Sequence, residues 1–282
     1  MERLNPLNDY IFQKLLGEKG DEEQLLSFLN AVLKRTGKDK LISVEIQENK
    51  VLTAEIIGDK MSVLDVRAVT DNNTKINVEV QLRNFGNMDK RSLFYWSGEY
   101  GRGIAAGQDY ILLPNVIAIN IVNFDFIPLD DFHTTYHLWE DKHRHILTDA
   151  LEIHFIEVSK FKRLADKDIK NNPLHRWLTY LDKNTPENIL QEVLGMDSAI
   201  KKTDRKLAFI SNDKEALRAY HLREMALSDW TSGINNAKRE EKIDIAKNLL
   251  KMGLSFSQIA EGTGLEIDKI KEIQEQVNNP EI

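Results

Sequence analysis

Two acidic residues, Asp65 and Glu79, interrupt two neighbouring apolar runs, residues 61–69 and 75–82. Side chains alternate across a β-strand, and the Asp-Asn-Asn-Thr segment between the runs tolerates the backbone angles of a turn. The runs are therefore predicted to form a β-hairpin in which Asp65 and Glu79 lie opposite each other, with Cβ atoms about 4.5–5.5 Å apart. Carboxylate oxygens this close together can hold a hard divalent cation such as Mg²⁺ or Mn²⁺.

The spacing alone leaves a structural interpretation of the two acids open. An antiparallel sheet often has one solvated face, where Arg67 and Arg83 could form ion pairs with Asp65 and Glu79. Against this interpretation, two like charges at this separation repel each other, and the flanking side chains are all of core type. These flanking residues are Leu64, Val66, Val78 and Val80.

The elements that must position the hairpin follow from the periodicity of the whole chain. We expect helices over residues 10–35 (with a break at 17–21), 87–108 and 173–230, and strands over 42–48, 52–57, 61–69, 75–82, 116–124 and 151–158. This order predicts an α/β core followed by an all-helical region. We divide the chain into a core at residues 1–165, a helical extension at 166–237 and a tail at 238–282.

The tail contains a helix-turn-helix pattern over residues 256–273. Ala260 allows two helices to approach closely, Gly264 permits the turn, and Ile270 packs the second helix back. The second helix carries more acidic than basic residues, and acids in the major groove of DNA are repelled by phosphate. We therefore expect the tail to contact protein, including a second copy of the chain, rather than to read DNA.

Composition restricts the function and the compartment. The net charge of −7 argues against a protein that only coats nucleic acid, so any DNA contact must use a local patch. The absence of cysteine excludes disulfides and fits a cytoplasmic protein. Residues 1–10 are polar, and the most apolar stretch, 110–127, is interrupted by proline and polar residues, so we expect no signal peptide and no membrane span.

Histidines and basic clusters give less specific signals. Five histidines lie between His133 and His154, but no third ligand is dictated by their spacing, so a zinc site is not favoured. Lys160, Lys162 and Arg163 follow the last core strand and could contact phosphate. A second basic cluster comprises Lys201, Lys202, Arg205 and Lys206. Acids surround both clusters, so a solvated face is the simpler interpretation of each.

Several segments together resemble the PD-(D/E)XK-type transposase or recombination-promoting nuclease family. The segments are Leu4–Phe12, the hairpin blocks 62–67 and 76–81, the aromatic run Arg91…Tyr95-Trp96-Ser97…Tyr100, and the blocks 113–119, 153–158 and 172–178. They cover most of residues 1–230 in the order expected of that family.

The resemblance implies a restriction-endonuclease-like fold, in which a mixed sheet is flanked by helices, and a metal-dependent endonuclease acting on double-stranded DNA. Asp65 and Glu79, together with the backbone carbonyl of Val80, would hold Mg²⁺ or Mn²⁺, which activates water and stabilises charge on the attacked phosphate. Gln81 stands where the superfamily's motif has lysine. Gln81 can orient a water but cannot supply positive charge.

Other residues would then complete the site. Arg83, Lys90 or Arg91 could supply the missing positive charge. Asp9 could be a third acidic ligand, or it could instead cap the N-terminus of the first helix.

Two functions from different classes follow. The first is an active DNA endonuclease. The alternative is a catalytically inactive nuclease-fold protein that binds DNA or protein, which the glutamine at position 81 and the acidic tail favour. A transposase that also joins strands is a third interpretation, for which the sequence offers no second chemistry.

Overall fold

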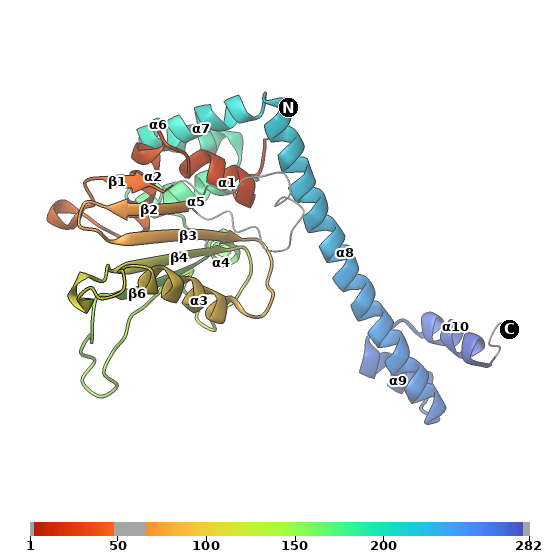
Figure 1. Ribbon diagram of the computed structural model, residues 1–282. Helices are drawn as coiled ribbons and strands as arrows, with labels where there is room; N and C mark the ends of the chain where they lie inside the picture. The colour runs from red at the N-terminus through yellow and green to blue at the C-terminus, as the bar shows by residue number, and fades with distance from the viewer. Residues whose placement is uncertain (1–2, 48–65, 279–282) are drawn as a thin grey trace. The chain divides into compact units, whose positions relative to one another are not determined.

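The computed structural model describes residues 3–47 and 66–278 of the chain (Figure 1). The chain divides into two compact units, Met1–Arg223 and Glu224–Ile282. The predicted division at residues 165 and 237 stays a prediction.

The first unit is built on a mixed sheet, with six strands in the described part of the chain, in the order β1-β2-β3-β4-β6-β5. The strands are β1 Val44–Ile46, β2 Val66–Thr70, β3 Lys75–Gln81, β4 Val116–Val122, β5 His133–Tyr136 and β6 Leu151–Glu157. β3, β4 and β6 are mutually parallel, whereas β1, β2 and β5 are antiparallel to their neighbours. Every residue of β4 is buried, as a central parallel strand covered on both faces requires.

The β2–β3 hairpin has the register that the sequence predicts. Val66 pairs with Val78 and Val69 with Lys75. The connecting turn is closed by hydrogen bonds between Thr70 and Thr74, and Asn73 adopts a left-handed φ of 61°, which asparagine tolerates better than most residues. The turn residues therefore fix which side chains of the two strands share a face.

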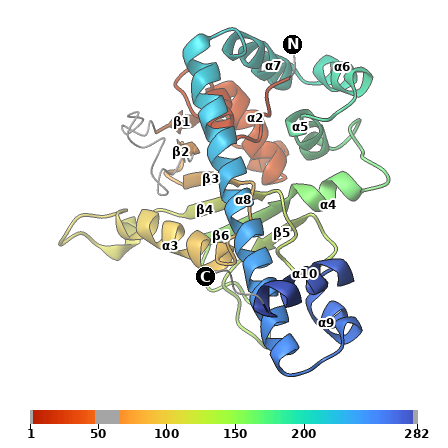
Figure 2. The same ribbon diagram turned by 90° about the vertical axis from the view of Figure 1, so that its right-hand side faces the viewer.

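One face of the sheet carries the main hydrophobic core (Figures 1 and 2). It is covered by α1 (Asp9–Leu16), α2 (Glu22–Val32), α5 (Pro173–Leu181), α6 (Glu187–Met196) and α7 (Ser198–Ile210). Phe28 contacts Phe12 and Trp177 edge-to-face, with ring centroids 5.9 and 5.6 Å away. The predicted break in the first helical region is present, because α1 ends at Leu16 and α2 begins at Glu22.

The opposite face of the sheet is covered by α3 (Met88–Gly101), which connects β3 to β4 (Figures 1 and 2). A smaller cluster lies there, with Met88 packed against Ala118, Val122 and residues of β6. The helix ends at Gly101, with Arg102 as its C-cap, and is therefore shorter than the predicted helix, which runs to residue 108. Short helical segments η1 (Gly37–Asp39), η3 (Tyr110–Leu112) and α4 (Val158–Arg163) complete the unit, together with the start of α8.

The second unit contains the rest of α8 (Lys214–Lys251), α9 (Phe256–Thr263) and α10 (Ile267–Asn278). Ser255 and Gln258 form a capping box at the start of α9, and Gly264 ends it with φ of 66°. Ala246, Ile259, Ile270 and Ile273 form a separate buried cluster. The predicted all-helical C-terminal region is thus confirmed, with the two helices of the helix-turn-helix pattern on either side of Gly264.

The predicted α/β class with flanking helices is likewise confirmed. The expected strand at 52–57 and the first part of the run at 61–69 lie outside the described residues. No helix in the described ranges is long and apolar enough to cross a lipid bilayer.

Candidate active site

Glu79 lies on the face of the sheet that α3 covers. In β3, the alternation places Asn77, Glu79 and Gln81 on that face, and the parallel ladder sets Glu79 beside Asn120 of β4. Only 4% of the Glu79 surface is exposed. A carboxylate at this depth requires a charged or hydrogen-bonding partner, since burying an isolated charge is costly.

Arg91 supplies one such partner from the first turn of α3. Its Nη2 lies 2.6 Å from the Glu79 Oε1, while its guanidinium carbon lies 5.3 Å from the centroid of the Tyr95 ring. Tyr95 follows Arg91 by one helical turn, so the ring supports the guanidinium through a cation–π contact. Helix α3 therefore fixes the group that faces the buried carboxylate.

The electrostatics of Glu79 reflect both neighbours. Burial raises the pKa of the Glu79 carboxyl above its ordinary value, and the Arg91 guanidinium lowers the pKa without cancelling the effect of burial. The site therefore favours ligands that add positive charge next to Glu79.

Three buried side-chain oxygens on this face of β3 accept no hydrogen bond from any described residue. They are Asn77 Oδ1, Glu79 Oε2 and Gln81 Oε1. The Gln81 amide nitrogen donates one hydrogen bond, to the Arg83 carbonyl oxygen at 2.7 Å. Buried acceptors without partners are rare in folded proteins, because leaving one unpaired is costly. Oxygens of this kind are the ligands of hard divalent cations, so the donor set fits Mg²⁺ or Mn²⁺.

Of the other two predicted metal ligands, Asp65 and Val80, the structure describes only Val80. Asp65 lies outside the described residues. Val80 is in β3. Its side chain is partly buried and packs against the main core, on the face of the sheet opposite Glu79. Among the residues that the structure describes, no three His, Asp or Glu side chains are arranged to hold a metal ion.

Asp9 is the first residue of α1 and does not cap that helix. The cap is Asn8, whose side chain accepts hydrogen bonds from the backbone N–H groups of Tyr10 and Ile11. The expected helix cap is therefore present, but it is Asn8 and not Asp9. Both Asp9 carboxylate oxygens accept hydrogen bonds from Arg223, at 3.2 and 2.5 Å. Helix α1 packs on the face opposite α3, and a metal role for Asp9 stays a prediction.

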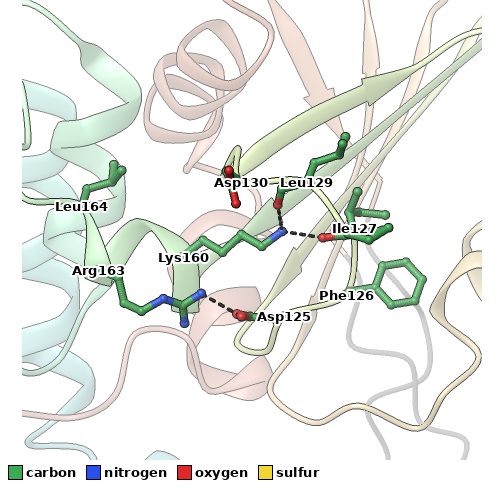
Figure 3. Close-up of a pocket in the computed structure, with 9 residues that line it drawn as sticks. Asp125, Phe126, Ile127, Leu129, Asp130, Lys160, Arg163 and Leu164 are labelled. Carbon is green, nitrogen blue, oxygen red and sulfur yellow. Dashed lines mark hydrogen bonds and ion pairs between the residues drawn. The ribbon is translucent and has the colours of Figure 1, made fainter.

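In the basic cluster after β6, the Lys160 ammonium is already occupied by protein acceptors, and phosphate contacts by Lys162 and Arg163 stay predictions. Lys160 is buried and donates to the carbonyl oxygens of Ile127 and Leu129 (Figure 3), each at 2.6 Å. It also donates to the Glu157 carboxylate at 2.7 Å. All three N–H donors of its ammonium group are thereby used. The physical reason is that Glu157 is fully buried and needs a cation beside it, so the expectation of a phosphate contact at Lys160 is not supported.

The two neighbouring basic residues form ion pairs nearer the surface. Arg163 and Asp125 line the same pocket of about 540 Å³ and form an ion pair at 2.7 Å. Figure 3 shows the two side chains facing each other. Lys162 lies 3.4 Å from Asp182. Lys90, in the first turn of α3, is exposed.

Sequence reasoning missed two polar groups that hold α3 and the sheet together. Asn120 donates to the Ser92 hydroxyl at 2.9 Å and to the His154 carbonyl oxygen at 3.0 Å. The signal was an asparagine in the middle of an otherwise apolar strand, beside the position of Glu79.

The histidines also form a cluster that spacing alone did not reveal. His133 Nε2 lies 2.9 Å from His154 Nδ1, and His154 Nε2 lies 2.7 Å from the Glu152 carboxylate. The two rings come from the paired strands β5 and β6 and bind each other.

The mixed sheet with helices on both faces is consistent with a restriction-endonuclease-like α/β fold. A family model described as PD-(D/E)XK nuclease family transposase matches residues 6–237, and the chain belongs to that family. Searches of curated proteins and of solved structures gave no match. The resemblance stated from the sequence is thereby confirmed.

Proposed function

We propose that this protein is a divalent-metal-dependent DNA endonuclease that hydrolyses phosphodiester bonds in double-stranded DNA. Asp65 and Glu79, with the Val80 carbonyl oxygen, hold Mg²⁺ or Mn²⁺, and Gln81 orients a water. The bound ion would lower the pKa of that water and stabilise negative charge on the phosphate.

The observation that carries the proposal is the uncompensated oxygen of Glu79. Oε1 binds Arg91, whereas Oε2 is buried without a partner among the described residues, next to the equally unpaired oxygens of Asn77 and Gln81. The pairing of Val66 with Val78 adds support, because it is the register on which the predicted hairpin of Asp65 and Glu79 rests. Two carboxylates there would bring the charge that a hard cation needs.

A binding protein that keeps the nuclease fold is the second candidate. The observation that favours it is the Glu79–Arg91 ion pair, in which the glutamate side chain is 6% exposed. Such a pair can satisfy Glu79 structurally, without a metal.

Cleavage of supercoiled plasmid with magnesium, manganese or calcium, run beside an Asp65→Ala variant, separates the two candidates. The proposal expects cleavage with magnesium or manganese and none from Asp65→Ala. A folded wild-type protein that leaves the plasmid intact with every metal would favour the binding protein.

A further inference from the structure

Gln81 cannot provide the positive charge that a phosphodiester bond under attack requires. Its amide is neutral, and one of its two N–H donors is bound to the Arg83 carbonyl oxygen. A cation from another element must therefore lie close to Glu79 if the site is to stabilise charge on a phosphate.

Arg91 meets this requirement by position. It contacts Glu79 at 2.6 Å, and the side chain of Arg91 is 31% exposed whereas that of Glu79 is 6% exposed. The guanidinium thus lies between the buried carboxylate and solvent. Its five N–H donors in a planar fork match the oxygens of a phosphate. Among the described residues, the buried Arg91 Nε has no hydrogen-bond partner.

The support beneath Arg91 does not depend on Glu79. The Tyr95 ring lies one turn further along α3 and contacts the guanidinium at 5.3 Å. A guanidinium held over a ring keeps its N–H edge directed sideways, toward acceptors in its plane. Arg91 can therefore exchange one anionic partner for another without losing this contact.

We propose that Arg91 is a catalytic residue with two successive partners, an inference that rests on the proposed function. Without metal, Arg91 is the counter-ion of Glu79. With the carboxylate engaged by a divalent cation, Arg91 donates its N–H groups to the phosphate of the bond being cleaved.

Replacing Arg91 should have opposite effects on Mn²⁺ affinity, which should rise, and on the rate of cleavage, which should fall. Arg91→Ala removes a cation that competes for Glu79, so Mn²⁺ alone, titrated by calorimetry without DNA, should bind several-fold more tightly than to the wild type. The same variant should cleave plasmid on the order of 100-fold more slowly, the usual cost of removing one donor to a developing anion. Arg91→Lys, which retains the charge, should restore part of the rate.

Arg102→Ala is the matched control, because Arg102 also pairs with a glutamate, Glu99 at 2.7 Å, and is the C-cap of the same helix α3. It should change neither Mn²⁺ affinity nor cleavage. Thermal melting confirms that each variant is folded, and Arg91→Gln replaces Arg91→Ala if the latter unfolds.

The outcomes separate this inference from the function on which it rests. Weaker Mn²⁺ binding by a folded Arg91 variant, or cleavage equal to that of the wild type, overturns the role of Arg91 and leaves the endonuclease intact. A wild-type protein that neither binds Mn²⁺ nor cleaves overturns the endonuclease itself.

Discussion

The Lys160 ammonium lies 2.7 Å from the Glu157 carboxylate at a depth where Glu157 has no exposed surface. Glu157 also accepts hydrogen bonds from the backbone of Phe126 and Ile127. The pair thus ties the start of α4 to the loop after β4. Its stability rests on both charges being present, because either one alone would be buried without compensation.

Lys160→Met should therefore lower the free energy of unfolding by about 3–5 kcal/mol, the usual cost of breaking a buried pair. Two backbone carbonyls would also lose their donor. Urea denaturation of the folded chain measures the change. DNA binding by protein that remains folded should keep its salt dependence, since the buried Lys160 ammonium is occupied by three protein acceptors.

Lys162→Met is the control for that experiment. Lys162 is more exposed and lies 3.4 Å from Asp182, so its loss should cost less than about 1 kcal/mol. Equal effects of the two substitutions would show that the buried pair has no special role.

The histidine cluster predicts a loss of stability in mild acid. Burial lowers the pKa of His133 from 6.5 to about 3, and the neighbouring His154 and Lys34 act in the same direction. Between these values the unfolded chain binds a proton that the folded chain excludes. The free energy of unfolding should then fall as the pH falls below 6.5, by up to about 1.4 kcal/mol per pH unit.

Denaturation of the wild type and of His133→Asn between pH 7 and pH 5 measures this contribution, which the variant should lack. His143→Asn is the control, because the His143 side chain is 72% exposed. The window stays above the ordinary pKa of 4.5 for Glu152, whose pKa is lowered by its bond to His154 although burial opposes it. Parallel pH profiles for the wild type and His133→Asn would refute the assignment.

The C-terminal helices should contribute little to DNA affinity. Lys269 and Lys271 of α10 form ion pairs with Glu272 and Asp268 on the same helix, which leaves little net positive charge for phosphate. Removing residues 238–282 should leave the salt dependence of DNA binding nearly unchanged, because that slope counts displaced counterions. We expect the deletion to alter oligomeric state or activity instead. A large fall in the slope would make the tail a DNA reader.

The hairpin shows how far the sequence alone could reach. Alternation and the turn residues around Asn73 predicted both the register and the shared face of Asn77, Glu79 and Gln81, because strand geometry is local. The partner of Glu79 could not be predicted in the same way. Helix α3 has apolar residues on all sides, so its pattern does not reveal which side faces the sheet or that Arg91 meets Glu79.

In the basic cluster after β6, the sequence could not predict which side chain is buried. Lys160, Lys162 and Arg163 are alike in sequence, yet Lys160 is buried and the other two are partly exposed. What separates them is Glu157, three residues before Lys160 and at the end of a fully covered strand. Burial of that acid is a tertiary property, and the spacing of charges does not contain it.

The most direct test of the metal site is the rate of magnesium-dependent cleavage of supercoiled plasmid by Glu79→Gln, compared with Glu99→Gln. Glu79 lies beneath α3 and pairs with Arg91. Glu99 belongs to α3 and pairs with Arg67 and Arg102. The substitution preserves shape and removes one negative charge in each case. The account predicts that Glu79→Gln loses cleavage by orders of magnitude while remaining folded, whereas Glu99→Gln retains it. Cleavage by folded Glu79→Gln at the wild-type rate would contradict the account.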